Sequence, residues 1–134
     1  MEADETHVPI DRDGDIIAAR QKARELAVHV GFSGSDLTII ATAISEVARN
    51  IVVYATRGEI VLSAVQRGSR RGVLVVARDH GPGIPDIERA MRDGFSTGKS
   101  LGLGLPGARR LMDEFEIVSE IGKGTTVTMR KWTR

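Results

Sequence analysis

The sequence Ser45-Glu46-Val47-Ala48-Arg49-Asn50 lies in a stretch whose apolar residues recur at the spacing of an α-helix. The residues that form this apolar face are Ile40, Ala41, Ile44, Val47, Ala48 and Ile51. Glu46 and Asn50 are four residues apart, so on a helix they lie one turn apart on one face. Burying both groups without partners costs several kcal/mol, so they need polar contacts. Alone, such a pair is more often a loop cap or a solvent-facing pair than a functional site.

Length and composition are those of an ordinary globular protein. The chain has 134 residues, 41% of them hydrophobic and 28% charged, which predicts a single domain over residues 1–134 with a flexible tail at 1–7. The net charge of +1 gives no reason to expect a nucleic-acid or membrane partner. The N-terminus is acidic, unlike a secretory signal, and no uninterrupted apolar run approaches the roughly 20 residues of a membrane span. Because there are no cysteines, a disulfide framework is excluded, and we expect a cytoplasmic protein.

The first sixty residues predict a short edge strand followed by two helices. Residues 8–10 can form the strand, since proline is tolerated at a sheet edge. The first helix is expected to start with Asp13 or Asp15 as its N-cap and to stop at Gly31. Its apolar stripe consists of Ile16, Ile17, Ala23, Leu26, Ala27 and Val30. The second helix, capped by Ser33 or Ser35, ends before Arg57.

The second half of the chain predicts two hairpins and shorter helices. Residues 59–66 and 73–78 flank a rather long basic loop, and residues 116–120 and 125–132 flank a glycine turn. Between the hairpins we expect a short helix at 86–92 and a third helix carrying Ala108, Leu111 and Met112. Helices that come early and antiparallel hairpins that come late predict an α+β fold, with the helices covering one face of a sheet.

The sequence Asp79-His80-Gly81-Pro82-Gly83 directly follows a predicted strand. Glycines permit backbone conformations closed to other residues and allow a flat ligand to approach. A carboxylate at the strand end can accept a hydrogen bond from an exocyclic amine such as that of adenine. Taken alone, the motif is also typical of an ordinary strand-end turn with a solvated aspartate.

Gly102-Leu103-Gly104-Leu105-Pro106-Gly107 leads from a loop into a helix, where exposed amides favour an anion. Its glycine spacing matches a dinucleotide fingerprint, but no clear strand precedes it, and the other motifs of protein kinases are absent. The run from Gly94 to Ser100 has three residues between its glycines where a phosphate-binding Walker loop needs four. We therefore interpret Lys99 as a residue of a mobile lid.

In chain order, the motifs Glu46-x-x-x-Asn50, Asp79-x-Gly81-x-Gly83, the glycine run from Gly102 and Gly122-x-Gly124-Thr125 resemble those of the GHKL (Bergerat) ATPase and kinase superfamily. The resemblance implies a two-layer α/β sandwich of the histidine-kinase-like ATPase type, with a mixed, mostly antiparallel sheet. The chain is too short for members with a transducer domain. Its histidines also do not lie on a preceding long helix, which disfavours a sensor histidine kinase.

Within the superfamily, the chain is similar to the anti-sigma-factor serine kinases, in particular the RsbT-type switch kinases of the bacterial stressosome. Three stretches carry this similarity: 45–50, the Asp-Gly-Phe-Ser-Thr of 93–97, and the Leu-Met-Asp-Glu-Phe-Glu-Ile of 111–117. One departure from the commonest superfamily pattern is Arg49, where a smaller residue often precedes the asparagine. Its contact could be phosphate or solvent.

The resemblance implies ATP and Mg²⁺ as cofactors and gives each motif a role. Glu46 would be the general base, Asn50 the Mg²⁺ ligand, and Asp79 the adenine acceptor. Gly81 and Gly83 would clear space for adenine, with Thr125 supporting the contact through water. The phosphates would meet Gly102, Leu103, Gly104 and Gly107, beneath a lid that includes Phe95, Ser96, Thr97 and Lys99.

The implied function is that of an ATP-dependent serine/threonine kinase that phosphorylates STAS-domain proteins of a stressosome. It would act as a partner switch in general stress signalling, because its release would activate a downstream signalling enzyme. The alternative is a nucleotide-gated binding module that sequesters or activates a partner with little turnover.

Overall fold

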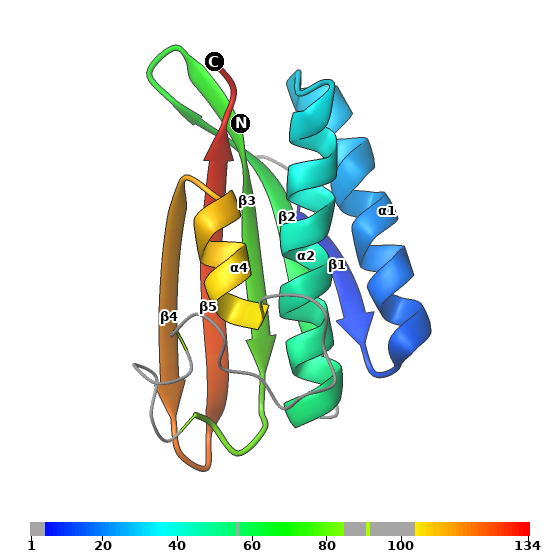
Figure 1. Ribbon diagram of the computed structural model, residues 1–134, viewed down its shortest axis with the longest axis vertical. Helices are drawn as coiled ribbons and strands as arrows, with labels where there is room; N and C mark the ends of the chain where they lie inside the picture. The colour runs from blue at the N-terminus through cyan, green and yellow to red at the C-terminus, as the bar shows by residue number, and fades with distance from the viewer. Residues whose placement is uncertain (1–4, 56, 85–90, 92–103) are drawn as a thin grey trace.

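The computed structural model describes residues 5–55, 57–84, 91 and 104–134. The helices are α1 (Asp13–Val30), α2 (Ser35–Tyr54) and α4 (Gly104–Leu111). The strands are β1 (Glu5–Ile10), β2 (Gly58–Arg67), β3 (Arg70–Asp79), β4 (Glu114–Glu120) and β5 (Gly124–Trp132). Figure 1 shows the helices packed side by side on one face of the sheet, which confirms the predicted α+β arrangement.

The five strands form one sheet in the order β1-β2-β3-β5-β4. Every strand pairing in the described sheet is antiparallel, where the expectation was a mixed, mostly antiparallel sheet. Both predicted hairpins are present, and β5 is inserted between β3 and β4. As a result, the carboxyl end of β3 lies next to the start of β5, which brings Asp79 close to Thr125.

The core lies between the sheet and the helices. Along β3 the buried residues alternate with partly exposed ones, because successive side chains point to opposite faces of a strand. Val73, Val75 and Ala77 face the helices, and α2 contributes Ile40, Ile44, Val47 and Ile51 to the same layer. This packing fixes α2 against the sheet and sets the orientation of its polar residues.

The predicted N-cap of α1, Asp13 or Asp15, is wrong. Arg12 occupies the N-cap position, and the Asp15 carboxylate accepts backbone N–H bonds from Asp11 and Arg12 at 2.8 and 3.2 Å. Asp15 therefore satisfies the helix start from inside the first turn. Ile17, expected in the apolar stripe, is 51% exposed, whereas the predicted stop at Gly31, with φ of 121°, is confirmed.

Helix α2 begins at Ser35, with Gly34 rather than a serine at the N-cap. Gly34 has φ of 61°, a left-handed conformation that a glycine adopts without strain. By length and composition α2 could cross a membrane, with a mean hydropathy of 1.4 over its best window. Half of that window is buried within the fold, so α2 serves here as the core helix.

Three further boundaries differ from the sequence prediction. Residues 5–7 belong to β1 rather than to a flexible tail, because they pair with β2 up to Ser63. The long basic loop is in fact a tight turn, since Arg67 pairs with Arg70 in the ladder. Met112 follows the last residue of α4. The helix expected at 86–92 lies outside the described residues except for the buried Met91.

Candidate functional site

Helix α2 carries Glu46 and Asn50 toward the start of α4. Glu46 is only 8% exposed, and its Oε1 accepts a hydrogen bond of 3.2 Å from the backbone N–H of Gly104. Its Oε2 lies 3.8 Å from a guanidinium nitrogen of Arg49, whose side chain is 43% exposed. Asn50 is partly buried one turn further on. The structure thus brings the Glu-x-x-x-Asn motif beside the glycine motif that is distant in sequence.

Asp79 is buried at the carboxyl end of β3, with 7% of its surface exposed. Its Oδ1 accepts backbone N–H bonds from Gly81 at 2.9 Å and from Thr125 at 3.2 Å. Both bonds use the same oxygen, so Oδ2 receives neither of them. Two amides therefore hold the carboxylate in place and leave one oxygen for another donor.

The glycines near Asp79 are required by the protein's own packing. A Cβ on Gly81 would lie 2.6 Å from Cβ of Ala55, the residue that ends α2. A Cβ on Gly83, which has φ of 83°, would lie 2.5 Å from the carbonyl oxygen of Glu120. These glycines therefore let α2 and the β4–β5 turn close around Asp79, and their role in clearing space for adenine stays a prediction.

Ser119 is a member of this site that the motif search missed. Its hydroxyl accepts the backbone N–H of Ile84 at 2.7 Å and lies 2.8 Å from the hydroxyl of Thr125. Ser119 pairs directly with Thr125 across the β4–β5 ladder. Only this register brings the two hydroxyls together, so sequence spacing alone gave no signal for Ser119. The two residues tie the strand end to the segment that follows Gly83.

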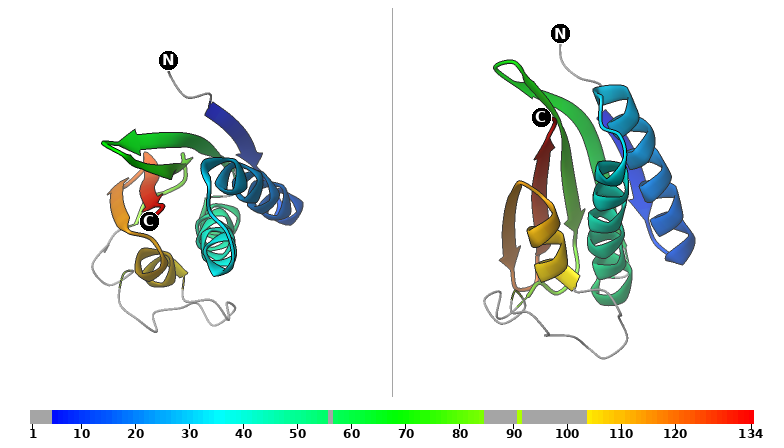
Figure 2. Two further views of the ribbon diagram at one scale, coloured as in Figure 1. Left: turned by 90° about the horizontal axis from the view of Figure 1, so that it is seen from above. Right: turned by 45° about the horizontal axis from the view of Figure 1, so that its top comes forward.

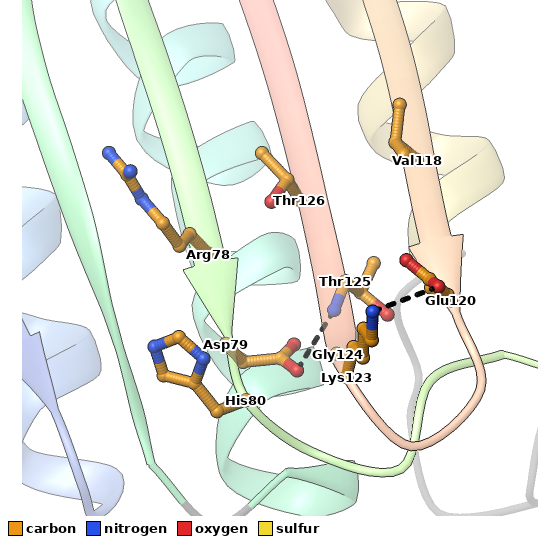
Figure 3. A pocket seen from close by; sticks show the side chains of 9 residues that line it. All are labelled: Arg78, Asp79, His80, Val118, Glu120, Lys123, Gly124, Thr125 and Thr126. Atoms are coloured by element: carbon orange, nitrogen blue, oxygen red, sulfur yellow. Dashed lines mark hydrogen bonds and ion pairs between the residues drawn. The ribbon is translucent and has the colours of Figure 1, made fainter.

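A hollow opens at this end of the sheet, and Figure 3 shows Asp79 and Thr125 side by side in its lining, joined by a hydrogen bond. Its lining comes from β3, β4 and β5: Arg78, Asp79, His80, Val118, Glu120, Lys123, Gly124, Thr125 and Thr126. Because successive side chains of a strand point to opposite faces, several of these residues lie on the face of the sheet away from the helices. The hollow therefore extends beyond the surroundings of Asp79. Lys123 pairs with Glu120 at 3.4 Å on its rim.

The remaining predicted site residues divide into two groups. Gly107 is buried inside α4, and Gly104 begins that helix with φ of 64°. Phe95, Ser96, Thr97, Lys99, Gly102 and Leu103 lie outside the described residues. The described residues contain no cluster of three His, Asp or Glu side chains that could hold a metal ion. The Glu46 carboxylate lies beside Gly104, and Asn50 follows one turn further along α2.

Comparison with known protein families matches residues 10–131 to the model for the histidine kinase-like ATPase domain. The chain belongs to this family. Its order of elements and its buried aspartate at the end of β3 can now be interpreted in that setting. Membership in the histidine kinase-like ATPase family implies the use of ATP.

Among curated relatives, the chain is 49% identical over 131 residues to the serine/threonine-protein kinase RsbT of Bacillus subtilis, covering 98% of both chains. It is 32% identical to an anti-sigma F factor of a Thermoanaerobacter species, covering 85% of this chain and 82% of the relative. Identity of 49% over nearly the whole of both chains supports a serine/threonine-protein kinase, and the two relatives together support a kinase of the partner-switching type.

Among solved structures, the fold is similar to that of the RsbU and RsbW domains of a Mycobacterium tuberculosis protein, with a TM-score of 0.61 and 27% identity. The match covers 96% of this chain and 31% of that longer chain. The sandwich of antiparallel sheet and helices is therefore shared over almost the whole chain.

Proposed function

We propose that this protein is an ATP-dependent serine/threonine kinase that phosphorylates STAS-domain proteins and switches between protein partners in general stress signalling. The observation that carries the proposal is the 49% identity to RsbT over nearly the whole of both chains. The residues at the Glu46–Gly104 contact suit this chemistry, because phosphoryl transfer depends mainly on positioning and charge stabilisation.

Glu46 is proposed as the general base that takes the proton of the substrate hydroxyl. A base must be fixed within hydrogen-bond reach of the proton it removes. The N–H of Gly104 and the guanidinium of Arg49 hold the two oxygens of the Glu46 carboxylate from two sides. For Arg49 the sequence left open a contact with phosphate or with solvent, and in the structure its guanidinium lies beside the proposed base.

Asp79 is proposed to select adenine. Its Oδ1 is engaged by Gly81 and Thr125, so Oδ2 can accept the exocyclic amine of adenine. The Thr125 hydroxyl, oriented by Ser119, would support this contact through water. Guanine carries a carbonyl oxygen where adenine carries the amine, so the same carboxylate would repel it.

Asn50 is proposed to hold Mg²⁺ through its side-chain oxygen, because Mg²⁺ prefers hard oxygen ligands and keeps several waters. The metal would neutralise charge on the transferred phosphoryl group. The backbone amides of four residues are proposed to donate hydrogen bonds to the phosphates: Gly102, Leu103, Gly104 and Gly107. A lid that includes Phe95, Ser96, Thr97 and Lys99 is proposed to cover them. Since Glu46 bonds the Gly104 amide, a phosphate at that amide would compete with this carboxylate.

The finer assignments rest on the likeness to RsbT. We propose a cytoplasmic protein with STAS-domain substrates in a stressosome and a downstream signalling enzyme that its release activates. Incubation with γ-labelled ATP, Mg²⁺ and purified STAS domains tests the assignment. Label should enter a serine or threonine of the STAS protein. If the STAS proteins stay unlabelled although the kinase is folded and binds ATP, the assignment is refuted.

The second candidate function is a nucleotide-gated binding module with little turnover. The similarity to anti-sigma F factors favours it, since their name denotes action by binding another protein. This function would be identified by a stable complex with a partner that forms only with ATP, in which phosphoryl transfer is slower than dissociation of the complex. Transfer faster than dissociation identifies the kinase.

A further inference from the structure

A cluster of arginines occupies the end of the sheet opposite Asp79. Figures 1 and 2 show the β2–β3 hairpin bending away from the helix layer there, next to the C-terminal end of β5. Arg67, Arg70 and Arg71 lie at the turn of the hairpin, and Arg130 and Trp132 lie on the neighbouring β5. We call these five residues the hairpin patch.

Trp132 is the platform of the hairpin patch. The guanidinium of Arg67 lies 4.6 Å from the centre of its ring, and that of Arg70 lies 5.8 Å away. A Cβ on Gly72 would come within 2.8 Å of the ring, so a glycine is needed for the indole to pack. Trp132 is consequently only 7% exposed, and the arginines present their charge above it.

The carboxylate of Glu114 joins several members of this cluster. Glu114 accepts hydrogen bonds from Arg67 at 2.7 Å and from the indole N–H of Trp132 at 2.9 Å, and it lies 3.4 Å from Arg130. The Arg67 hydrogen bond, followed by that of Trp132, holds the pKa of Glu114 below its ordinary value. Glu114 thus contacts two of the four arginines, Arg67 and Arg130, and the four arginines outnumber the two carboxylates Glu114 and Asp113 beside Trp132, so positive charge remains in excess.

This excess is costly for the hairpin itself. Arg67 and Arg70 are directly opposite each other in the ladder, and like charges at such positions destabilise a strand pair. Both side chains are exposed, as is that of Arg71, and are therefore accessible to a partner. Arginine's planar guanidinium matches carboxylates with paired hydrogen bonds, and a partner carboxylate would offset the repulsion.

We propose that the hairpin patch is a docking surface for an acidic segment of a protein partner. A nucleic acid is less suitable, because Trp132 lies beneath arginine and cannot stack on a base. A membrane is less suitable because the exposed large apolar side chains of the described residues all lie outside the patch. Carboxylates on a folded or extended protein segment can bind to the guanidinium groups alone, with no stacking surface and no exposed apolar side chains.

The hairpin patch and the candidate kinase site lie at opposite ends of β3, which begins at Arg70 and ends at Asp79. Ten residues of strand span about 30 Å. An acidic segment could therefore remain bound while nucleotide enters or leaves, and the inference does not depend on the STAS assignment.

The test compares two double variants with the same change in net charge. Arg70→Gln/Arg71→Gln removes charge from the hairpin patch, and Arg20→Gln/Arg24→Gln removes it from the exposed face of α1. The probe is a fluorescein-labelled peptide of alternating glutamate and serine at low ionic strength. Single-stranded DNA of equal charge and phosphatidylglycerol vesicles are the competing probes. Arg70→Lys/Arg71→Lys, which keeps charge, serves as a second patch variant.

We expect the peptide to bind the native chain and its affinity to fall about tenfold or more in Arg70→Gln/Arg71→Gln. The α1 variant should change the affinity less than about twofold, and the lysine variant should fall between them. Equal losses in both glutamine variants, or no binding of the peptide, would overturn the proposal. Tighter binding of DNA or vesicles than of peptide through the same arginines would replace it with the corresponding partner class.

Discussion

Glu46 and Asp79 are the two buried carboxylates among the described residues, and both are held by backbone N–H groups. Gly104 donates to Glu46, and Gly81 and Thr125 donate to Asp79. A hydrogen bond to an ionised acceptor is stronger than one to a neutral acceptor, which makes burial of a carboxylate tolerable. Each carboxylate keeps an oxygen outside these amide bonds.

At the residue scale, Asp79→Asn should abolish ATP binding while the fold is retained. The carboxamide oxygen can still accept the N–H groups of Gly81 and Thr125, but its NH₂ group would then face the adenine amine, donor against donor. Isothermal calorimetry measures the affinity, and thermal unfolding checks the fold. Asp113→Asn is the matched control, because Asp113 caps the N–H of Trp132 at the far end of β5. Unchanged ATP affinity in a folded Asp79→Asn protein would remove the adenine assignment.

At the scale of elements, the β4–β5 turn closes tightly over the end of β3. A Cβ on Gly124, which has φ of 118°, would lie 2.0 Å from the carbonyl oxygen of Asp79. Gly122 has φ of 83° in the same turn but open space around its Cβ position. Substitutions at the two glycines therefore separate the effect of backbone strain from that of steric contact.

Gly124→Ala should lower the free energy of unfolding by at least about 2 kcal/mol, because strain and a clash with Asp79 act together. Gly122→Ala carries only the strain and should cost less. Urea unfolding of both variants gives the difference. Equal losses would mean that the close approach of Gly124 to Asp79 does not contribute to stability.

The edge strand β1 carries a pH-sensitive contact. His7 bonds Glu59 of β2 at 3.1 Å and Glu5 at 3.3 Å, and the hydrogen bond to Glu59 is the main cause of the raised pKa of His7. Since the folded chain holds this proton more tightly than the unfolded chain, the stabilisation is fully present below the unfolded value of 6.5. It is lost as the pH rises through the folded-state pKa.

The free energy of unfolding of the native chain should therefore decline slightly above about pH 6.5, and His7→Gln should remove that decline. The effect is small because His7 and both glutamates are exposed, where solvent screens the charges. Urea titrations across this range measure it. A slope that survives in His7→Gln would assign the pH dependence to another group.

At the scale of the whole molecule, the sequence predicted the α+β architecture, both hairpins and the helix that carries Glu46, because long apolar periods and glycine turns are local signals. It did not predict the N-cap at Arg12, the tight turn after Arg67 or the strand at 5–7. The strand at 5–7 depends on pairing with β2, far along the chain, whereas the N-cap depends on the backbone bonds that Asp15 accepts nearby and the turn on the pairing of Arg67 with Arg70. Ser119 was missed because only the β4–β5 register brings it to Thr125. The roles of Glu46, Asn50 and Asp79 stay predictions.

Mg²⁺ and ATP together should stabilise the whole fold. A ligand that binds only the native state adds about 2.7 kcal/mol when its concentration is about a hundredfold above its Kd. Thermal unfolding should shift upward with ATP and Mg²⁺, and less with GTP. Removal of Mg²⁺ by EDTA, or the change Asn50→Ala, should reduce the ATP-dependent shift because a metal ligand is lost. A shift that is the same with EDTA would contradict the metal role of Asn50.

Single-turnover transfer by Glu46→Gln tests the proposed role of Glu46 as the base that takes the substrate proton. Glutamine keeps the size of the side chain and an acceptor for the Gly104 amide, so ATP affinity should stay near the native value. Transfer of label to the STAS-domain substrate should fall by about 10² to 10⁴-fold, at the lower end if the transition state is loose. A purely structural Glu46 predicts lower stability with undiminished transfer per folded molecule. Native transfer rates on a preparation with normal ATP affinity would contradict the account.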